Sequence, residues 1–216
     1  PPRYRSSAAS DVYKRQEGPI YLEREVVGAR EIEVLVVGDG NGEALTLGER
    51  ETSVQPGGRR AFAESPVPGL VEEHASRLRQ SAAALASRLN WPGLISVRFL
   101  VPPDGRGYLL RLRPGLQPWH GVTELTLGVD LVDAQIRIAL GDKLGWEPYH
   151  LSEKGVAFCL RIFSTDTEAR ALTSCETPPS VRVESGFEVG DTVRPGEEIL
   201  QILSLIHISE PTRRYE

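Results

Sequence analysis

The fold of this chain is decided by the stretch GVTELTLGVDLV (Gly121–Val132), which continues through Gln135, Ile136, Ala139, Gly141 and Leu144. Within it, Asp130 directly precedes an apolar run and has a side chain suited to a helix N-cap. Gly141 follows the run, where a residue in the left-handed conformation commonly ends a helix. We therefore expect a helix over residues 131–140.

Strand-like segments flank this helix on both sides. Alternating or β-branched patterns predict strands at residues 20–27, 31–37, 44–47, 95–101, 108–113, 156–163 and 181–183. The strands at 95–101 and 108–113 are joined through Pro102-Pro103-Asp104-Gly105, a hairpin-type connection. Apolar residues at helical spacing predict an amphipathic helix from Val71 to Leu89, ended by Pro92 and Gly93. This order predicts an α+β fold with a mainly antiparallel sheet flanked by helices.

The composition is that of an ordinary globular domain, with 40% hydrophobic and 25% charged residues. A net charge of −5 gives no general attraction to nucleic acid or to anionic membranes. Cys159 and Cys175 lack the spacing of a metal or redox motif, so we expect a reduced, cytoplasmic setting. The longest apolar runs are broken by charge, as Arg98 interrupts residues 94–101, which predicts no membrane span.

Both ends of the chain resemble translated sequencing-adapter read-through rather than native protein. Residues 5–16 read RSSAASDVYKRQ, residues 204–212 read SLIHISEPT, and the chain contains no methionine. Ordinary flexible termini are the alternative. We expect non-native tails at 1–16 and 203–216, with residues 17–202 forming one domain from a longer gene.

The stretch at 121–144 resembles the V-T-E-x-x-x-G-x-D-L-V-x-x-Q-x-x-x-A-x-G-x-x-L segment of biotin carboxylases. These ATP-grasp enzymes carboxylate biotin from bicarbonate and ATP. ERETSVQ at residues 49–55 is similar to the family's E-R-D-C-S-x-Q, and AESPVPGL at residues 63–70 is similar to its E-E-A-P-A-P-G-L. The resemblance implies the C-terminal domain of the biotin carboxylase ATP-grasp fold, from about residue 22 to about residue 202. The family's N-terminal domain and glycine-rich lid would lie upstream.

The resemblance implies ATP, Mg²⁺ and biotin as cofactors. It implies carboxylase subunits or a biotin carrier domain as partners, with a homodimer as a further option. It places two Mg²⁺-ligand positions of the hairpin at Arg111 and Arg113, and a third on the preceding strand at Arg98. Hard cations require oxygen ligands, and arginine provides none. We therefore predict no metal site, and no metal-bridged ATP, at these positions.

The positions for bicarbonate chemistry have also changed. The family's bicarbonate-holding arginine is matched by Gly115, and its general-base glutamate is matched by Trp119. An indole has no basic lone pair, and loss of a positioned base typically costs about 10²–10⁴-fold in rate. On the phosphate side, Arg60 takes a lysine position and Gly58 a histidine position. The resemblance thus implies a catalytically inactive scaffold or regulatory homologue of an acyl-CoA or pyruvate carboxylase.

Some family positions keep their residue. Glu33 retains the glutamate of a nucleotide-contacting H-x-E pair, in which Glu31 replaces the histidine. Arg161 resembles the arginine that steadies the biotin enolate, so it is the one catalytic candidate. The candidates for binding a nucleotide or another anion are Glu33, Gln55, Arg60, Arg98, Arg111, Arg113 and Gln117.

Several alternatives remain open. Arg98, Arg111 and Arg113 share one sheet face, where they could bind an anion in place of Mg²⁺, pair with carboxylates such as Glu31 and Glu33, or lie exposed. A divergent active ligase, or a working carboxylase misaligned at the hairpin, is a rival, although residues 108–117 contain no Asp, Glu or Asn. Residues 186–200 also resemble the hammerhead of biotinyl and lipoyl carriers, which would imply a fused carrier domain.

Overall fold

The computed structural model describes residues 22–142, 146 and 151–206. The expected tail at 1–16 and most of the expected tail at 203–216 lie outside these residues. The elements are β1 (Arg30–Asp39), β2 (Ala44–Glu51), the 3₁₀ helix η1 (Pro56–Gly58), β3 (Phe62–Ser65), α2 (Glu72–Arg88), β4 (Pro92–Val101), β5 (Tyr108–Pro114), α3 (His120–Leu127), α4 (Leu131–Leu140), β6 (Val156–Phe163), β7 (Arg170–Ala171), β8 (Arg182–Ser185), β9 (Thr192–Val193) and β10 (Glu198–Ile206).

The predicted fold class is confirmed. Eight strands form one sheet in the order β5-β4-β1-β2-β3-β6-β10-β8, and neighbouring strands pair antiparallel. The hairpin β4–β5, strand β6 and both predicted helices lie where the sequence places them. The strand expected at 20–27 is wrong over its described part, since residues 22–27 are outside any strand. Strand β10 continues to Ile206, so residues 203–206, which we expected to be tail, belong to a strand.

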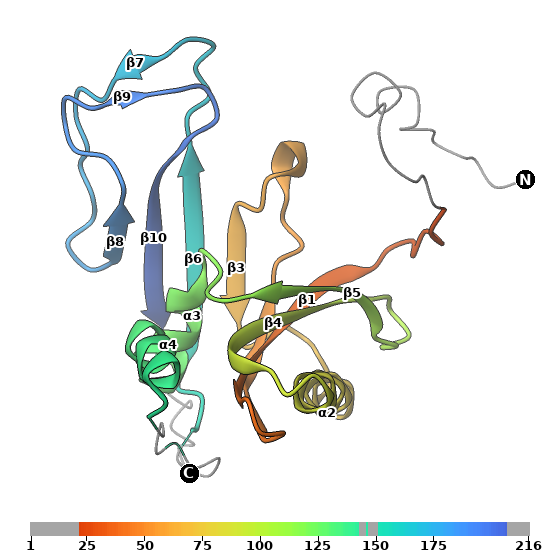
Figure 1. Cartoon of the computed structure of the whole chain (residues 1–216). Coiled ribbons are helices and arrows are strands. Elements are labelled where there is room, and N and C mark those ends of the chain that lie inside the picture. Colours follow the sequence, from red (N-terminus) through yellow and green to blue (C-terminus); the bar gives the residue numbers. More distant parts are fainter. Residues whose placement is uncertain (1–21, 143–145, 147–150, 207–216) are drawn as a thin grey trace, which may run out of the picture.

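The sheet consists of two halves that meet at a thin seam. Strands β2 and β3 are paired through a single residue pair, Glu51 with Glu64. By contrast, β1 and β4 are paired over ten residues. Figure 1 shows β3, β6 and β10 running across the direction of β1, β4 and β5. The half-sheets β5-β4-β1-β2 and β3-β6-β10-β8 therefore share little backbone hydrogen bonding.

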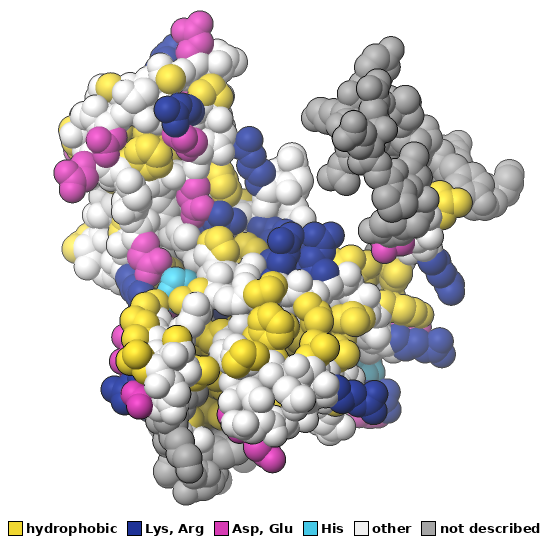
Figure 2. Space-filling view, viewed as in Figure 1, with side chains coloured by type: hydrophobic (Ala, Val, Ile, Leu, Met, Phe, Trp, Pro, Cys, Tyr) yellow, Lys and Arg dark blue, Asp and Glu magenta, His cyan; other side chains and the backbone are white. Residues whose placement is uncertain are grey.

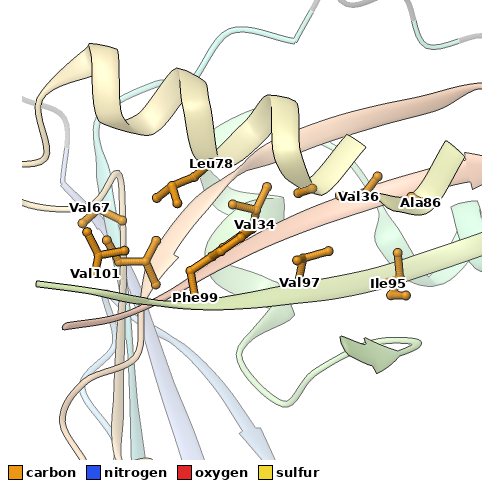
Figure 3. Close-up of a cluster of buried hydrophobic side chains, with 11 residues drawn as sticks. Val34, Val36, Val67, Leu78, Ala86, Ile95, Val97, Phe99 and Val101 are labelled. Carbon is orange, nitrogen blue, oxygen red and sulfur yellow. The ribbon is translucent and has the colours of Figure 1, made fainter. Parts of the chain in front are cut away.

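Helix α2 covers one face of the first half-sheet (Figure 3). The alternation of β1 and β4 directs Val34, Val97 and Phe99 toward Leu78 and Ala82 of α2. These side chains are all at most 3% exposed. Burial of this apolar surface, at roughly 25 cal/mol per Å², anchors the helix on the sheet.

The opposite face of the same half-sheet is also covered. Leu35, Leu47 and Leu94 pack there with Leu127 of α3 and Leu131 of α4. Because β1 is buried on both faces, any charged side chain on it must be paired within the protein. In the described part of the chain, no helix is both long enough and apolar enough to cross a membrane.

The ends of α4 follow the signals in the sequence. The Asp130 carboxylate accepts a hydrogen bond from the Asp133 amide at 2.8 Å, and Gly141 ends the helix with φ 84°. We expect Asp130→Ala to lower the free energy of unfolding by about 1 kcal/mol, because one helix-terminal N–H loses its partner. Urea unfolding would measure this, with the exposed Gln135→Ala on the same helix as control. An equal effect of the two substitutions would contradict the capping role.

Candidate functional site

The candidate site centres on Glu33 of β1, whose side chain is completely buried. Its Oε1 accepts hydrogen bonds from Arg50 Nη2 at 2.6 Å and Trp119 Nε1 at 3.0 Å, and its Oε2 accepts one from Arg98 Nε at 2.8 Å. Burial alone would raise the pKa of Glu33, but the charges of Arg50 and Arg98 hold it below its ordinary value. Glu33 is therefore a carboxylate whose oxygens are occupied by cationic and indole donors.

Glu31 forms the second acidic position, two residues earlier on the same face of β1. Its carboxylate accepts hydrogen bonds from Arg60 Nε at 2.9 Å and from Gln55 Nε2 at 3.0 Å. Arg98 Nη1 lies 3.7 Å from Glu31 Oε1. The loop around η1 thus brings Gln55 and Arg60 into contact with the sheet face that carries Glu33.

Trp119, which is 3% exposed, lies against the Glu33 carboxylate and donates a hydrogen bond to it. Three guanidinium groups lie over its ring, those of Arg98, Arg161 and Arg60, at 5.3, 5.6 and 5.9 Å from the ring centroid. Such cation–π contacts contribute about 0.5–2 kcal/mol each. The indole is therefore packed in the interior and held by these contacts.

Arg161, the catalytic candidate, is also engaged in structure. Its Nε donates to Glu198 Oε1 at 2.9 Å, and its Nη1 donates to the Arg60 carbonyl at 3.0 Å. Glu198 belongs to β10, which pairs with the strand that carries Arg161. This arginine therefore joins the second half-sheet to the η1 loop.

Arg111 and Arg113 differ from Arg98 in their surroundings. They lie on β5, the edge strand, and are exposed. Arg111 is directly opposite Arg98 across the β4–β5 ladder, and Arg113 is opposite Ser96. No salt bridge to either residue occurs within residues 22–142, 146 and 151–206.

The structure thus divides the predicted site residues into two groups. Glu33, Gln55, Arg60, Arg98, Gln117 and Arg161 converge near Trp119, with Gln117 accepting from Arg98 Nη2 at 3.1 Å. Of the alternatives expected for the three arginines, Arg98 follows the one in which the side chain pairs with carboxylates. Arg111 and Arg113 lie at the exposed edge.

Sequence reasoning missed Arg50 as a member of this network. Arg50 is 1% exposed and also donates to Thr123 Oγ1 of α3 at 3.2 Å. Arg50 is the direct cross-strand partner of Glu33 in the β1–β2 ladder. The strand predicted at 44–47 ends before Arg50, so sequence reasoning had no facing strand on which to pair these opposite charges.

The residues present do not fit Mg²⁺. Among the described residues there is no group of three or more His, Cys, Asp or Glu side chains placed to hold a metal ion. Both carboxylates of the site already accept hydrogen bonds from arginine, and arginine offers only N–H donors. The arrangement can attract anions, but it provides neither metal ligands nor a proton acceptor at Trp119.

One carboxyl outside the network titrates unusually. Although Glu153 is partly exposed to solvent, partial desolvation of its carboxyl, and then the nearby charge of Glu49, raise its pKa to about 7 from an ordinary value of 4.5. Between pH 4.5 and pH 7 the folded protein binds more protons at Glu153 than the unfolded chain does. Protonation of Glu153 therefore stabilises the fold at low pH, and this stabilisation is lost as the pH rises toward and through 7. We expect Glu153→Gln to raise the melting temperature more at pH 8 than at pH 5.

Melting curves at the two pH values would test this, with Glu73→Gln on the exposed face of α2 as control. A Glu153→Gln effect that is the same at pH 5 and pH 8 would contradict the raised pKa.

Comparison with known proteins relates this geometry to a family. The family described as "Carbamoyl-phosphate synthase L chain, ATP binding domain" matches residues 5–146. The match begins inside the 1–16 segment, whose non-native origin stays a prediction. The methylcrotonoyl-CoA carboxylase subunit alpha of Rattus norvegicus is 35% identical over 181 residues, which are 80% of this chain and 25% of that protein.

A biotin carboxylase of Allochromatium vinosum is 32% identical over 181 residues, covering 81% of this chain and 40% of that protein. Among solved structures, a biotin carboxylase domain of a single-chain bacterial carboxylase matches with a TM-score of 0.81 and 29% identity. That match covers 92% of this chain and 47% of the other chain. The chain spans about a quarter of the length of the carboxylase alpha subunits that it matches. It belongs to this ATP-binding domain family, and within it to the biotin carboxylases.

Proposed function

We propose that this chain is the C-terminal part of a biotin carboxylase-like domain, in a non-catalytic scaffold or regulatory homologue of a biotin-dependent acyl-CoA or pyruvate-type carboxylase. One observation carries the proposal, the buried Glu33–Arg98 ion pair closed by Trp119. By the family resemblance, Arg98 stands where a metal-ligand glutamate is expected and Trp119 where the general base is expected. Both replacements are engaged with Glu33, which keeps its family identity.

The mutual contacts support a stable, non-catalytic domain rather than loss of folding. A buried arginine without a partner would cost several kcal/mol. Arg98 instead has Glu33, Glu31 and Gln117 as neighbours. The site is therefore consistent with a protein that keeps the family's shape while it lacks the family's metal and base chemistry.

The test is calorimetric titration of ATP into the full-length product of the gene, with and without Mg²⁺. We expect no Mg²⁺-dependent binding of ATP and no bicarbonate-dependent ATP hydrolysis in the presence of biotin. The Allochromatium vinosum biotin carboxylase serves as the active control. Tight Mg²⁺-dependent binding with turnover would overturn the proposal and favour a working carboxylase.

The partners proposed for a scaffold are carboxylase subunits, a biotin carrier domain or a second copy of this chain. The matched proteins include carboxylase alpha subunits, and one structure of similar fold is described as a biotin carboxylase domain dimer. Two free cysteines support the proposed cytoplasmic location. Light scattering of the purified protein, alone and mixed with a carrier domain, would test the assembly.

A further inference from the structure

We infer that a cavity beside the start of helix α2 is a binding site for a small uncharged molecule that carries a carbonyl group on an apolar body. The cavity has a volume of about 270 Å³ and is enclosed by the start of β1, the loop that precedes α2 and the β4–β5 connection. Arg30 and Val101 both line it and are directly opposite each other in the β1–β4 ladder. Val101 packs with α2, so the cavity lies on the face of the sheet opposite to Glu31 and Glu33.

The size of the cavity limits its ligand. Small-molecule sites usually measure about 300–1,000 Å³, so this cavity is at the lower end of the range. It has room for one ring with a short substituent, and it is too small for a nucleotide. The inference is therefore independent of whether the protein binds or turns over ATP.

Most of the wall is apolar. Its side chains include Leu70, Val71, Val101, Pro102 and Pro103. Figure 3 shows Val101 at one end of the core beneath α2, and Figure 2 shows hydrophobic side chains gathered over the β4–β5 hairpin, whose connection forms one wall. The Cα atoms of Gly28 and Gly69 also border open space. An apolar ligand body is therefore favoured here, because it leaves water for a largely apolar surface.

Two polar side chains of the wall offer hydrogen-bond donors. Arg30 Nε donates to Glu51 Oε1 at 3.0 Å and its Nη2 donates to the Pro68 carbonyl at 2.7 Å, whereas Nη1 has no acceptor within the described residues. The imidazole of His74 has no hydrogen-bond partner among them either. Its ring is fixed against Gly105, where a Cβ atom would be 2.0 to 2.4 Å from three ring atoms. A carbonyl oxygen is a group that both donors could bind.

The charges around the cavity favour a neutral ligand over an anion. The guanidinium of Arg30 is paired with Glu51, and Glu64 is opposite Glu51 in the β2–β3 pair. The acidic residues that begin α2 are each paired with an arginine of the same helix. The lining therefore carries no excess positive charge that would attract a carboxylate, whereas an amide or a ketone needs none.

The test uses the full chain and three ring compounds of similar shape. Benzamide is neutral and has a carbonyl, toluene lacks the carbonyl, and benzoate is charged. NMR titration should show saturable binding of benzamide, with the largest amide shifts at residues 69–74 and 101–105. Toluene and benzoate should bind about fivefold more weakly or worse, because the first accepts no hydrogen bond and the second brings a charge.

Three variants locate the site. Val71→Trp should fill the cavity and weaken benzamide binding about tenfold or more, since Val71 lines it and makes no side-chain cap. Val27→Trp is the matched control, because Val27 is 78% exposed and is not part of the wall. It should bind like the wild type. His74→Phe keeps a ring against Gly105 and removes the N–H, so it should weaken binding of benzamide but not of toluene.

Circular dichroism would report that the variants are folded. The inference would be overturned by wild type that does not bind benzamide, by benzoate that binds more tightly than benzamide, or by folded Val71→Trp that binds like Val27→Trp. Failure of the proposed function has a different readout, Mg²⁺-dependent ATP turnover, so the two outcomes are distinguishable.

Discussion

Glu33→Ala is expected to lower the free energy of unfolding by about 3–5 kcal/mol, the usual cost of removing one member of a buried ion pair. Arg50 and Arg98 are 1% and 2% exposed, and each donates a hydrogen bond to the Glu33 carboxylate. Without it, the two buried guanidiniums of Arg50 and Arg98 and the partly exposed one of Arg60 would have Glu31 as the one remaining carboxylate of the network. Urea unfolding followed by circular dichroism would measure the loss.

The matched control is Glu73→Ala, which breaks the exposed i,i+4 pair with Arg77 on α2. Pairs of this type contribute about 0.3–0.5 kcal/mol, so this variant should unfold close to the wild type. A Glu33→Ala variant as stable as Glu73→Ala would show that the arginines are not held by Glu33.

Trp119→Ala is the second large effect, with an expected loss of about 3–5 kcal/mol. The substitution leaves a cavity next to Val122 and Cys159 in the core of the second half-sheet, and it removes the ring over which three guanidiniums lie. It also removes the indole donor to Glu33. Chemical denaturation of the purified variant is the measurement.

Trp119→Phe separates the two contributions. Phenylalanine keeps much of the ring but lacks the N–H. Glu33 Oε1 still accepts from Arg50, so the loss should be about 1.5–3 kcal/mol, the usual contribution of one hydrogen bond to a charged group. Equal losses for the two variants would show that the hydrogen bond, and not the packing of the ring, holds this residue. A loss below 1 kcal/mol for Trp119→Ala would contradict the structural role altogether.

The sequence predicts the elements whose signals are local. Helix α4 begins after Asp130 and ends at Gly141 because the cap residues adjoin an apolar run. Strand β6 is a compact apolar segment with recognisable ends. In both cases neighbouring residues decide the backbone conformation, so one sequence is sufficient.

Elements and contacts that depend on distant residues were not predictable in the same way. Helix α3 begins after Trp119 without a side-chain cap, and it is fixed by packing against β3, β6 and β10. Strand β10 continues to Ile206 because β6 offers partners for residues that resemble a tail. Family resemblance identified Glu33, but its pairing with Arg50 depends on the register of two strands.

The thin seam between β2 and β3 has a mechanical consequence. With one backbone pair across it, the ladder contributes little torsional stiffness, and side chains must resist a change of angle between the half-sheets. Arg50 of β2 reaches Thr123 on α3, which packs on the second half-sheet, and Ser65 Oγ of β3 donates to the Glu49 carbonyl. The angle between the half-sheets therefore depends on a few side chains at the seam, such as Arg50 and Ser65, whereas the shape of each half is held by its own backbone ladders.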